Sequence, residues 1–255
     1  MTFGNTDSSL YLLFGAIRQH STVALSGEAA DELFGGYLWF HNPGDVQRDT
    51  FPWIVDSDDI VRRVLDPGLV EKLDLPGYVD EQYRRALAEV PALTGPASAD
   101  PHERRMREVC YLFLTRYLPT LLDRKDPDEH GFGSRGAGPL LRPRLVEYMF
   151  GTPWVHKTFD GREKSLLRAA TADLLPLSVV QRVKSAYPAI QDATYDRMLR
   201  TRFTALLNDH NAAVAPLLSL DRSLALLDAT DNLRRAECIL SLQDFLTDYN
   251  VSLTI

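Results

Sequence analysis

Cysteine is scarce in this sequence, and positive charge is not in excess. Among 255 residues the only cysteines are Cys110 and Cys238, which predicts reduced thiols in a cytoplasmic compartment, with a disulfide as the weaker alternative. The formal net charge is −7 at pH 7. Because a nucleic-acid partner requires a basic surface that neutralises phosphates, this charge argues against nucleic-acid binding.

Long apolar segments and a targeting sequence are also lacking. The longest apolar run near the start, residues 10–17, is far shorter than the roughly 20 residues that a membrane-spanning helix needs. Residues 1–9 contain no basic segment of the kind that opens a signal peptide. We therefore expect a cytoplasmic protein without a membrane partner.

What the sequence does contain is enough apolar residues for a core and a mainly helical periodicity. Hydrophobic residues make up 45% of the chain and charged residues 25%, as in ordinary globular proteins. A short β-branched run predicts one strand, over residues 22–25. Apolar spacing predicts helices over residues 8–19, 56–63, 67–73, 77–89, 102–122, 163–174, 178–183, 192–207 and 220–248, with a loop over 91–101.

These elements favour an α/β fold class in which a mostly helical fragment keeps part of a parallel sheet. A short strand that runs into a glycine-containing turn is how parallel sheets present ligand sites at the carboxyl ends of their strands. We interpret residues 1–255 as one partial domain. Residues 1–40 supply the last strand and a ligand-binding turn, and residues 41–255 form a helical region.

The chemistry is concentrated in residues 23–37, which read VALSGEAADELFGGY. Ser26 and Gly27 form a tight turn after the strand, where backbone N–H groups can approach a nucleotide. Glu28 and Asp31 lie one turn apart on the same face of the following helix. Two acids beside a phosphate group can share a Mg²⁺ ion or divide into base and metal ligand. The alternative is a helix whose acidic first turn only complements the helix dipole.

Residues 26–37 resemble the SGE-x-ADE-x-FGGY signature of asparagine synthetases, which lies in their ATP-dependent synthetase domain. The resemblance extends over nearly the whole chain through residues 115–126, 144–150 and 161–188. The last segment is similar to the family's pattern G-x-E-K-x-L-L-R-x-A…L-P-x-x-V-x-x-R-x-K-x-x-x-P. The implied fold is a remnant of a parallel-sheet ATP-pyrophosphatase domain, similar to the adenine nucleotide alpha hydrolases, with a helical C-terminal region.

The resemblance also implies a reaction and its cofactors. The family's synthetase domain adenylates the side-chain carboxylate of aspartate with ATP and Mg²⁺ and releases pyrophosphate. Ammonia, which a separate glutaminase domain obtains from glutamine, then attacks the β-aspartyl-AMP to give asparagine.

Individual residues take their implied roles from the motifs that they match. Ser26 and Gly27 would contact the nucleotide, Glu28 would handle the ammonia proton or bind substrate, and Asp31 would be a Mg²⁺ ligand. Lys184 corresponds to a lysine that stabilises charge on the phosphates or the transition state. Without its surrounding motif, Lys184 would be interpreted as a solvated lysine at a helix end.

The family's pyrophosphate loop, S-G-G-x-D-S, has no counterpart in this sequence. In the family that loop precedes the SGE motif. We therefore expect the chain to lack the phosphate-binding loop, a second Mg²⁺ aspartate, most of the parallel sheet and the glutaminase domain. Such a chain is expected to be inactive alone, or active only with a complementing N-terminal polypeptide.

Residues 127–143 differ from the family in another way, because their spacing is kept but their residues are unrelated. Where the family has R-M-S-M-A, residues 127–131 read PDEHG. The bases CGG ATG AGC ATG GC encode RMSMA, and one additional C in front changes the reading to CCG GAT GAG CAT GGC, which encodes PDEHG. We infer that this segment is translated out of frame between an insertion and a compensating deletion. A diverged substrate loop is the alternative, and no substrate residue can be transferred to the segment in either case.

Two other functions stay open. The chain could be a helical binding or regulatory protein that keeps the scaffold without catalysis, or a relative that amidates a different carboxylate. The histidines show no metal-ligand spacing, so we do not expect a zinc site. Core packing, not ligand binding, is expected for Cys110 and for the aromatic residues Trp39, Phe40, Phe51 and Trp53.

Overall fold

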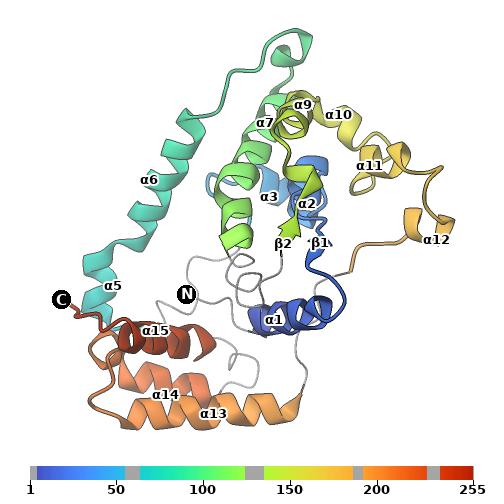
Figure 1. Ribbon diagram of the computed structural model, residues 1–255. Coiled ribbons are helices and arrows are strands. Elements are labelled where there is room, and N and C mark those ends of the chain that lie inside the picture. The colour runs from blue at the N-terminus through green and yellow to red at the C-terminus, as the bar shows by residue number, and fades with distance from the viewer. Residues whose placement is uncertain (1–4, 55–63, 124–134, 186–191, 229–235, 255) are drawn as a thin grey trace. The chain divides into compact units, whose positions relative to one another are not determined.

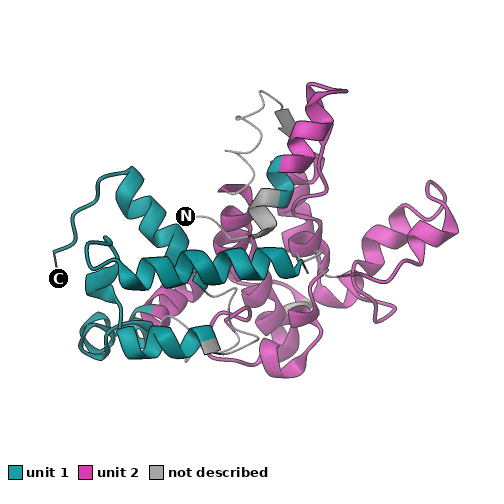
Figure 2. Ribbon diagram, turned by 90° about the horizontal axis from the view of Figure 1, so that it is seen from below, with its two compact units in different colours: residues 1–11, 56–78, 187–255 teal, residues 12–55, 79–186 magenta. Residues whose placement is uncertain are grey.

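The computed structural model describes residues 5–54, 64–123, 135–185, 192–228 and 236–254. Within these ranges the chain is mostly helical (Figure 1). Its contacts divide it into two compact units (Figure 2). Unit 1 comprises residues 1–11, 56–78 and 187–255, and unit 2 comprises residues 12–55 and 79–186. The boundary falls inside two helices, α1 (Asn5–Arg18) and α6 (Leu75–Ala88).

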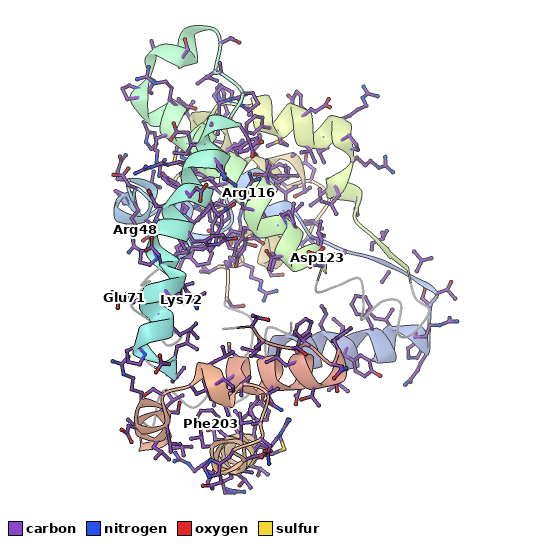
Figure 3. All side chains as sticks on the ribbon, turned by 90° about the vertical axis from the view of Figure 1, so that its left-hand side faces the viewer. Arg48, Glu71, Lys72, Arg116, Asp123 and Phe203 are labelled. Carbon is purple, nitrogen blue, oxygen red and sulfur yellow. The ribbon has the colours of Figure 1, made fainter. Side chains whose placement is uncertain are left out.

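Unit 1 is built from helices around one hydrophobic core. Its remaining elements are α5 (Pro67–Leu73), α13 (Ala193–Asn208), η5 (Ala215–Leu217), α14 (Leu220–Asp228) and α15 (Ala236–Asp248). The carboxylates of Asp66 and Asp192 cap the first turns of α5 and α13 by accepting backbone N–H groups, which explains where these helices begin. Phe203 of α13 (Figure 3) is fully buried among aliphatic side chains of α13, α14 and α15.

Unit 2 contains the strands and the residues singled out by the sequence. Its remaining elements are β1 (Val23–Leu25), α2 (Ala30–Phe34), η1 (Leu38–Phe40), α3 (Pro43–Val46), η2 (Pro96–Ala99), α7 (Pro101–Leu112), η3 (Phe113–Tyr117), β2 (Arg135–Ala137), η4 (Pro139–Leu141), α9 (Pro143–Gly151), α10 (Trp154–Lys157), α11 (Ser165–Ala170) and α12 (Leu177–Val180). η3 is a π-helical turn that continues α7, and the helix runs on through residues 118–123.

The two strands form one parallel pair, in which Val23 lies opposite Arg135 and Leu25 opposite Ala137. The mostly helical character and the strand over residues 22–25 are thus confirmed. The expected remnant of a larger parallel sheet is not confirmed, because the sheet of the described residues consists of this pair. β2 was not predicted, and it lies in the segment interpreted as out of frame, whose residues 127–134 fall outside the described ranges.

Most predicted helices form with small shifts of their ends. The predicted helix over residues 102–122 corresponds to α7 and its continuation, and the one over 163–174 shortens to α11. The helical stretch predicted over 220–248 contains α14 and α15. The helix predicted over 56–63 lies outside the described residues. Among the helices that the structure describes, none is both long and apolar enough to cross a membrane.

The aromatic residues that were expected to pack in a core do so in unit 2. Phe40 and Phe51 are buried, and Trp39 and Trp53 pack against them and their neighbours. The ring of Phe40 lies 4.4 Å from that of Phe113, measured between centroids. Both cysteines are free thiols: Cys110 is buried in this core, as predicted, and Cys238 is exposed.

A buried carboxylate fixes the start of α10 in unit 2. Glu103 of α7 accepts hydrogen bonds from the backbone N–H groups of Trp154 (2.7 Å) and Val155 (2.9 Å). These are N–H groups that a helix start leaves without intrahelical partners. Lys157 at the end of the same short helix is almost fully buried.

Candidate active site

Hydrogen bonds among its own residues stabilise the turn between β1 and α2. The hydroxyl of Ser26 accepts a hydrogen bond from the backbone N–H of Glu28 (3.1 Å), and the carbonyl of Gly27 accepts one from Ala30 (3.2 Å). A side chain added at Gly27 would meet no atom within 4 Å, so the space beside this residue is open. The turn therefore presents an accessible backbone at the carboxyl end of a strand.

Three acids, Glu28, Asp31 and Glu32, follow this turn. Glu28 is partly buried, and the described part of the chain gives its carboxylate no hydrogen bond or ion pair. Asp31 is also partly buried, whereas Glu32 is only 1% exposed. Burial raises the pKa of Glu32, and the neighbouring charges of Asp31 and Glu28 act in the same direction.

Two lysines neutralise Asp31. Lys164 places its Nζ 3.0 Å from one carboxylate oxygen of Asp31, and Lys184 forms an ion pair with the other oxygen. Lys184 is 153 residues away from Asp31 in sequence. The structure therefore brings together two of the residues that the sequence singled out, Asp31 and Lys184.

The two glycines that follow α2 make this arrangement possible. Gly35 ends α2 with φ 65°, a left-handed conformation that favours glycine, and a side chain there would overlap the ring of Trp154. A side chain at Gly36 would overlap the carboxylate of Asp31 and the Cε of Lys164. The Gly-Gly pair of the motif is thus explained by close packing against the ion pair and the core.

Tyr37 contacts both the acids and Lys184. Its hydroxyl donates a hydrogen bond to Glu32 (2.7 Å), and the Nζ of Lys184 lies 4.2 Å from the centroid of its ring. Burial raises the pKa of Tyr37, and so does the charge of Glu32, so the hydroxyl stays protonated and acts as a donor.

The segment that carries Lys184 is attached to α11. Glu163 accepts a hydrogen bond from the backbone N–H of Lys184 (3.2 Å) and pairs with Arg168 (2.5 Å), which also donates to the carbonyl of Val180 (2.6 Å). Burial alone would raise the pKa of Glu163, but these hydrogen bonds and the charge of Arg168 lower it, so it stays ionised. Lys164 and Lys184 line a cavity of about 450 Å³ beside α11 and α12.

Several of these residues were not predicted as site residues. Lys164 and Glu163 belong to the G-x-E-K pattern, and Tyr37 and Glu32 belong to the SGE-x-ADE-x-FGGY signature. Their presence in the two motifs was the available signal. The two motifs do not indicate the direction in which each of these side chains points.

The described residues of the site could hold a metal ion only together with ligands from elsewhere, such as a substrate. No three His, Cys, Asp or Glu side chains come together as a metal-binding group in the ranges that the structure describes. Mg²⁺ commonly binds through one or two protein carboxylates together with the phosphates of a substrate, so Asp31 alone fits that mode. Its two oxygens are occupied by Lys164 and Lys184 in this structure.

A turn at the end of a parallel strand, an acidic helix start and two lysines together define a site that can bind an anionic group and stabilise charge on it. The family model described as asparagine synthase matches residues 1–246, and the chain belongs to this family. It is 38% identical over 193 residues to asparagine synthetase [glutamine-hydrolyzing] 3 of Bacillus subtilis (strain 168). That match covers 76% of this chain but 30% of the relative, so the chain spans less than a third of the protein that it resembles.

Proposed function

We propose that this chain contributes to an ATP-dependent, amide-forming site of the asparagine synthetase type. In the proposed reaction, the side-chain carboxylate of aspartate attacks the α-phosphorus of ATP, pyrophosphate leaves, and ammonia displaces AMP from the acyl adenylate. The observation that supports this best is the ion pair of Asp31 with Lys184, which joins the two family motifs across the chain.

Lys184 and Lys164 are the proposed charge stabilisers. The attack of a carboxylate on ATP develops negative charge on the phosphate oxygens and on the leaving pyrophosphate. Ammonium groups placed beforehand beside that charge stabilise the transition state more than the ground state. Both lysines already lie on the same carboxylate, that of Asp31.

Asp31 is the proposed ligand of Mg²⁺. When bound, the ion would draw electrons from the phosphates that it contacts and neutralise part of their charge. For Asp31 to serve it, the carboxylate must exchange its lysine partners for the cation. The same exchange would release Lys164 and Lys184 toward the anionic substrate.

The turn residues have proposed roles of their own. The open space at Gly27 supports close approach of a nucleotide to the backbone, with Ser26 shaping the turn. The carboxylate of Glu28, which has no partner among the described residues, is suited to accept a proton from the attacking ammonia or to bind the substrate amine.

Because the chain spans 30% of its relative, we propose that the complete site also needs a polypeptide that provides the remainder, including a source of ammonia from glutamine. The test mixes the purified chain with the part of the Bacillus protein that the chain does not match, and measures AMP and pyrophosphate formed from ATP, Mg²⁺, aspartate and ammonium. We expect both products from the mixture, and little from the chain alone.

Three variants make this test specific. Lys184→Ala should abolish most product formation, and Glu28→Gln should suppress asparagine formation, whereas Lys72→Ala, at an exposed position in unit 1, should leave both unchanged. A mixture in which the wild-type chain forms no more AMP than Lys184→Ala would contradict the proposal.

A further inference from the structure

Tyr37 contacts both Lys184 and Glu32, but the proposed reaction gives it no role. We propose that Tyr37 is a positioning residue for Lys184: its ring face receives the ammonium group, and Glu32 fixes the ring through the tyrosine hydroxyl. This inference rests on the proposed function, in which Lys184 stabilises charge on the substrate.

Lys184 needs such a partner because its own segment fixes it poorly. Residues 182–185 belong to no helix or strand, and the Lys184 side chain is 31% exposed. The backbone N–H of Lys184 is anchored to Glu163, but the ammonium group sits at the end of a flexible four-carbon chain. Among the residues that the structure describes, that group contacts two side chains, the carboxylate of Asp31 and the ring of Tyr37.

Of these two contacts, only the one to Tyr37 is compatible with the proposed metal ligand. A carboxylate oxygen of Asp31 that binds Mg²⁺ no longer pairs fully with an ammonium group. The face of an aromatic ring attracts a cation through its quadrupole and is no ligand for Mg²⁺. It also leaves the N–H groups of Lys184 free to donate to substrate oxygens.

The ring of Tyr37 is itself held by neighbouring rings and by a hydrogen bond at its hydroxyl. The rings of Trp39, Phe113 and Tyr117 pack around it, each with its centroid 5.4 Å from that of Tyr37. Its hydroxyl donates to Glu32, whose side chain is buried. A rigid ring held in this way defines one place for the ammonium group.

The first test reads this contact directly, by NMR of the full chain without ATP or any partner. The sequence contains five lysines (Lys72, Lys125, Lys157, Lys164 and Lys184), so lysine labelled with ¹³C gives few ε-CH₂ signals, and Lys184→Arg identifies the one that disappears. Ring currents of Tyr37 should move the Lys184 signal upfield of the exposed Lys72. A Lys184 signal at the position of Lys72 would overturn the proposal.

Variants then distinguish the contribution of the Tyr37 ring to the Lys184 signal from the contributions of the Tyr37 hydroxyl and of Asp31. Tyr37→Phe loses the hydrogen bond to Glu32 but keeps the ring among its neighbouring rings, so it should keep most of the upfield shift. Tyr37→Leu should abolish the shift, and Asp31→Asn should leave it. Tyr78→Leu replaces an exposed tyrosine of unit 1 and is the matched control, which should leave the Lys184 signal unchanged. If Tyr37→Leu does not fold, the spectra of the wild type, Tyr37→Phe and Asp31→Asn still test whether the ring positions Lys184. Loss of the upfield shift in Asp31→Asn would show that Asp31 alone positions Lys184 and would overturn the proposal.

The functional test uses the mixture described for the proposed function. Tyr37→Leu should lower the rate at saturating ATP and aspartate by about fivefold or more, as expected for loss of a cation–π contact, with little change in the KM for ATP, and Tyr37→Phe should restore most of the rate. An increase in KM alone would contradict a positioning role. Because the NMR test needs no turnover, failure of the amide-forming function and failure of this inference give different results.

Discussion

Unit 1 and unit 2 bury different kinds of side chain. The core of unit 1 is aliphatic around Phe203, and the hydroxyl of its buried Ser223 has no hydrogen-bond partner among the described residues. Unit 2 has one core cluster rich in aromatic rings and one that is mainly aliphatic, together with a set of buried polar or charged residues: Glu32, Asp45, Glu103, Lys157 and Ser165. Burying charge is costly unless it is paired or hydrogen-bonded. The difference indicates that buried side chains hold unit 1 together mainly through apolar packing, whereas unit 2 also buries polar groups such as Glu32, which contacts Tyr37 of the candidate site, and Glu103, which caps α10.

The largest effect should follow from removing the central ring of unit 1. Phe203→Ala should lower the free energy of unfolding of this unit by about 3–5 kcal/mol, because it leaves a cavity in a fully buried core. Urea unfolding measures the loss, with Phe245→Ala, at a partly exposed position, as the control. If both variants lose the same amount, the core of unit 1 is not centred on Phe203.

The matching experiment in unit 2 removes a buried charge. Glu103→Ala should cost about 2–4 kcal/mol, since two backbone N–H groups at the start of α10 lose their acceptor. Glu103→Gln, which keeps one acceptor, should lose less, and Glu147→Ala, at an exposed position, should stay near zero. If Glu103→Ala loses no more stability than Glu147→Ala, then the buried carboxylate of Glu103 does not stabilise unit 2, and the contrast with the apolar core of unit 1 is wrong.

Glu32 should make the stability of unit 2 depend on pH. Burial raises the pKa of Glu32 above its ordinary value of 4.5. The stability that comes from this shift is therefore complete below that value and is lost as the pH rises through the higher pKa of the folded state. Glu32→Gln carries no such titration.

The Gln variant should thus gain stability relative to wild type as the pH rises toward neutral, by about 1–3 kcal/mol. Unfolding of both proteins in urea between pH 4 and 8 measures the difference. A difference that stays constant over this range would mean that Glu32 is ionised in the folded protein without cost.

The smallest effect concerns the buried hydroxyl of unit 1. Ser223→Ala removes an oxygen for which the described part of the chain provides no hydrogen-bond partner, so it should be neutral or stabilise unit 1 by up to about 1 kcal/mol. The midpoint of urea unfolding is a sufficient measure. A clear loss of stability would show that the hydroxyl has a partner, such as a buried water molecule.

Local sequence signals predicted much of the fold. The strand over residues 22–25 followed from its β-branched pattern, and the starts of α5, α7 and α13 follow from the aspartates that cap them. β2 was missed because its residues, Arg-Gly-Ala, have no strand propensity and depend on pairing with β1. Long-range pairing of this kind cannot be read from periodicity.

The candidate site was predictable only through the resemblance. Periodicity places Asp31 and Lys184 on separate elements, and nothing local indicates that they meet across 153 residues. Lys164 and Tyr37 were overlooked because their roles depend on where the chain turns at Gly35 and Gly36. Those turns are determined by close packing in the folded unit.

The central claim, that a carboxylate is activated by ATP beside Asp31 and Lys184, is tested most directly by following oxygen atoms. Aspartate labelled with ¹⁸O in its side-chain carboxylate is supplied with ATP, Mg²⁺ and ammonium to the chain and its complementing polypeptide, and the AMP formed is analysed by mass spectrometry. Adenylation followed by amidation transfers one ¹⁸O atom to AMP, and this is the result that we predict, with most of the labelled AMP lost in Lys184→Ala. AMP without ¹⁸O, or hydrolysis of ATP to ADP and phosphate instead, would contradict the claim.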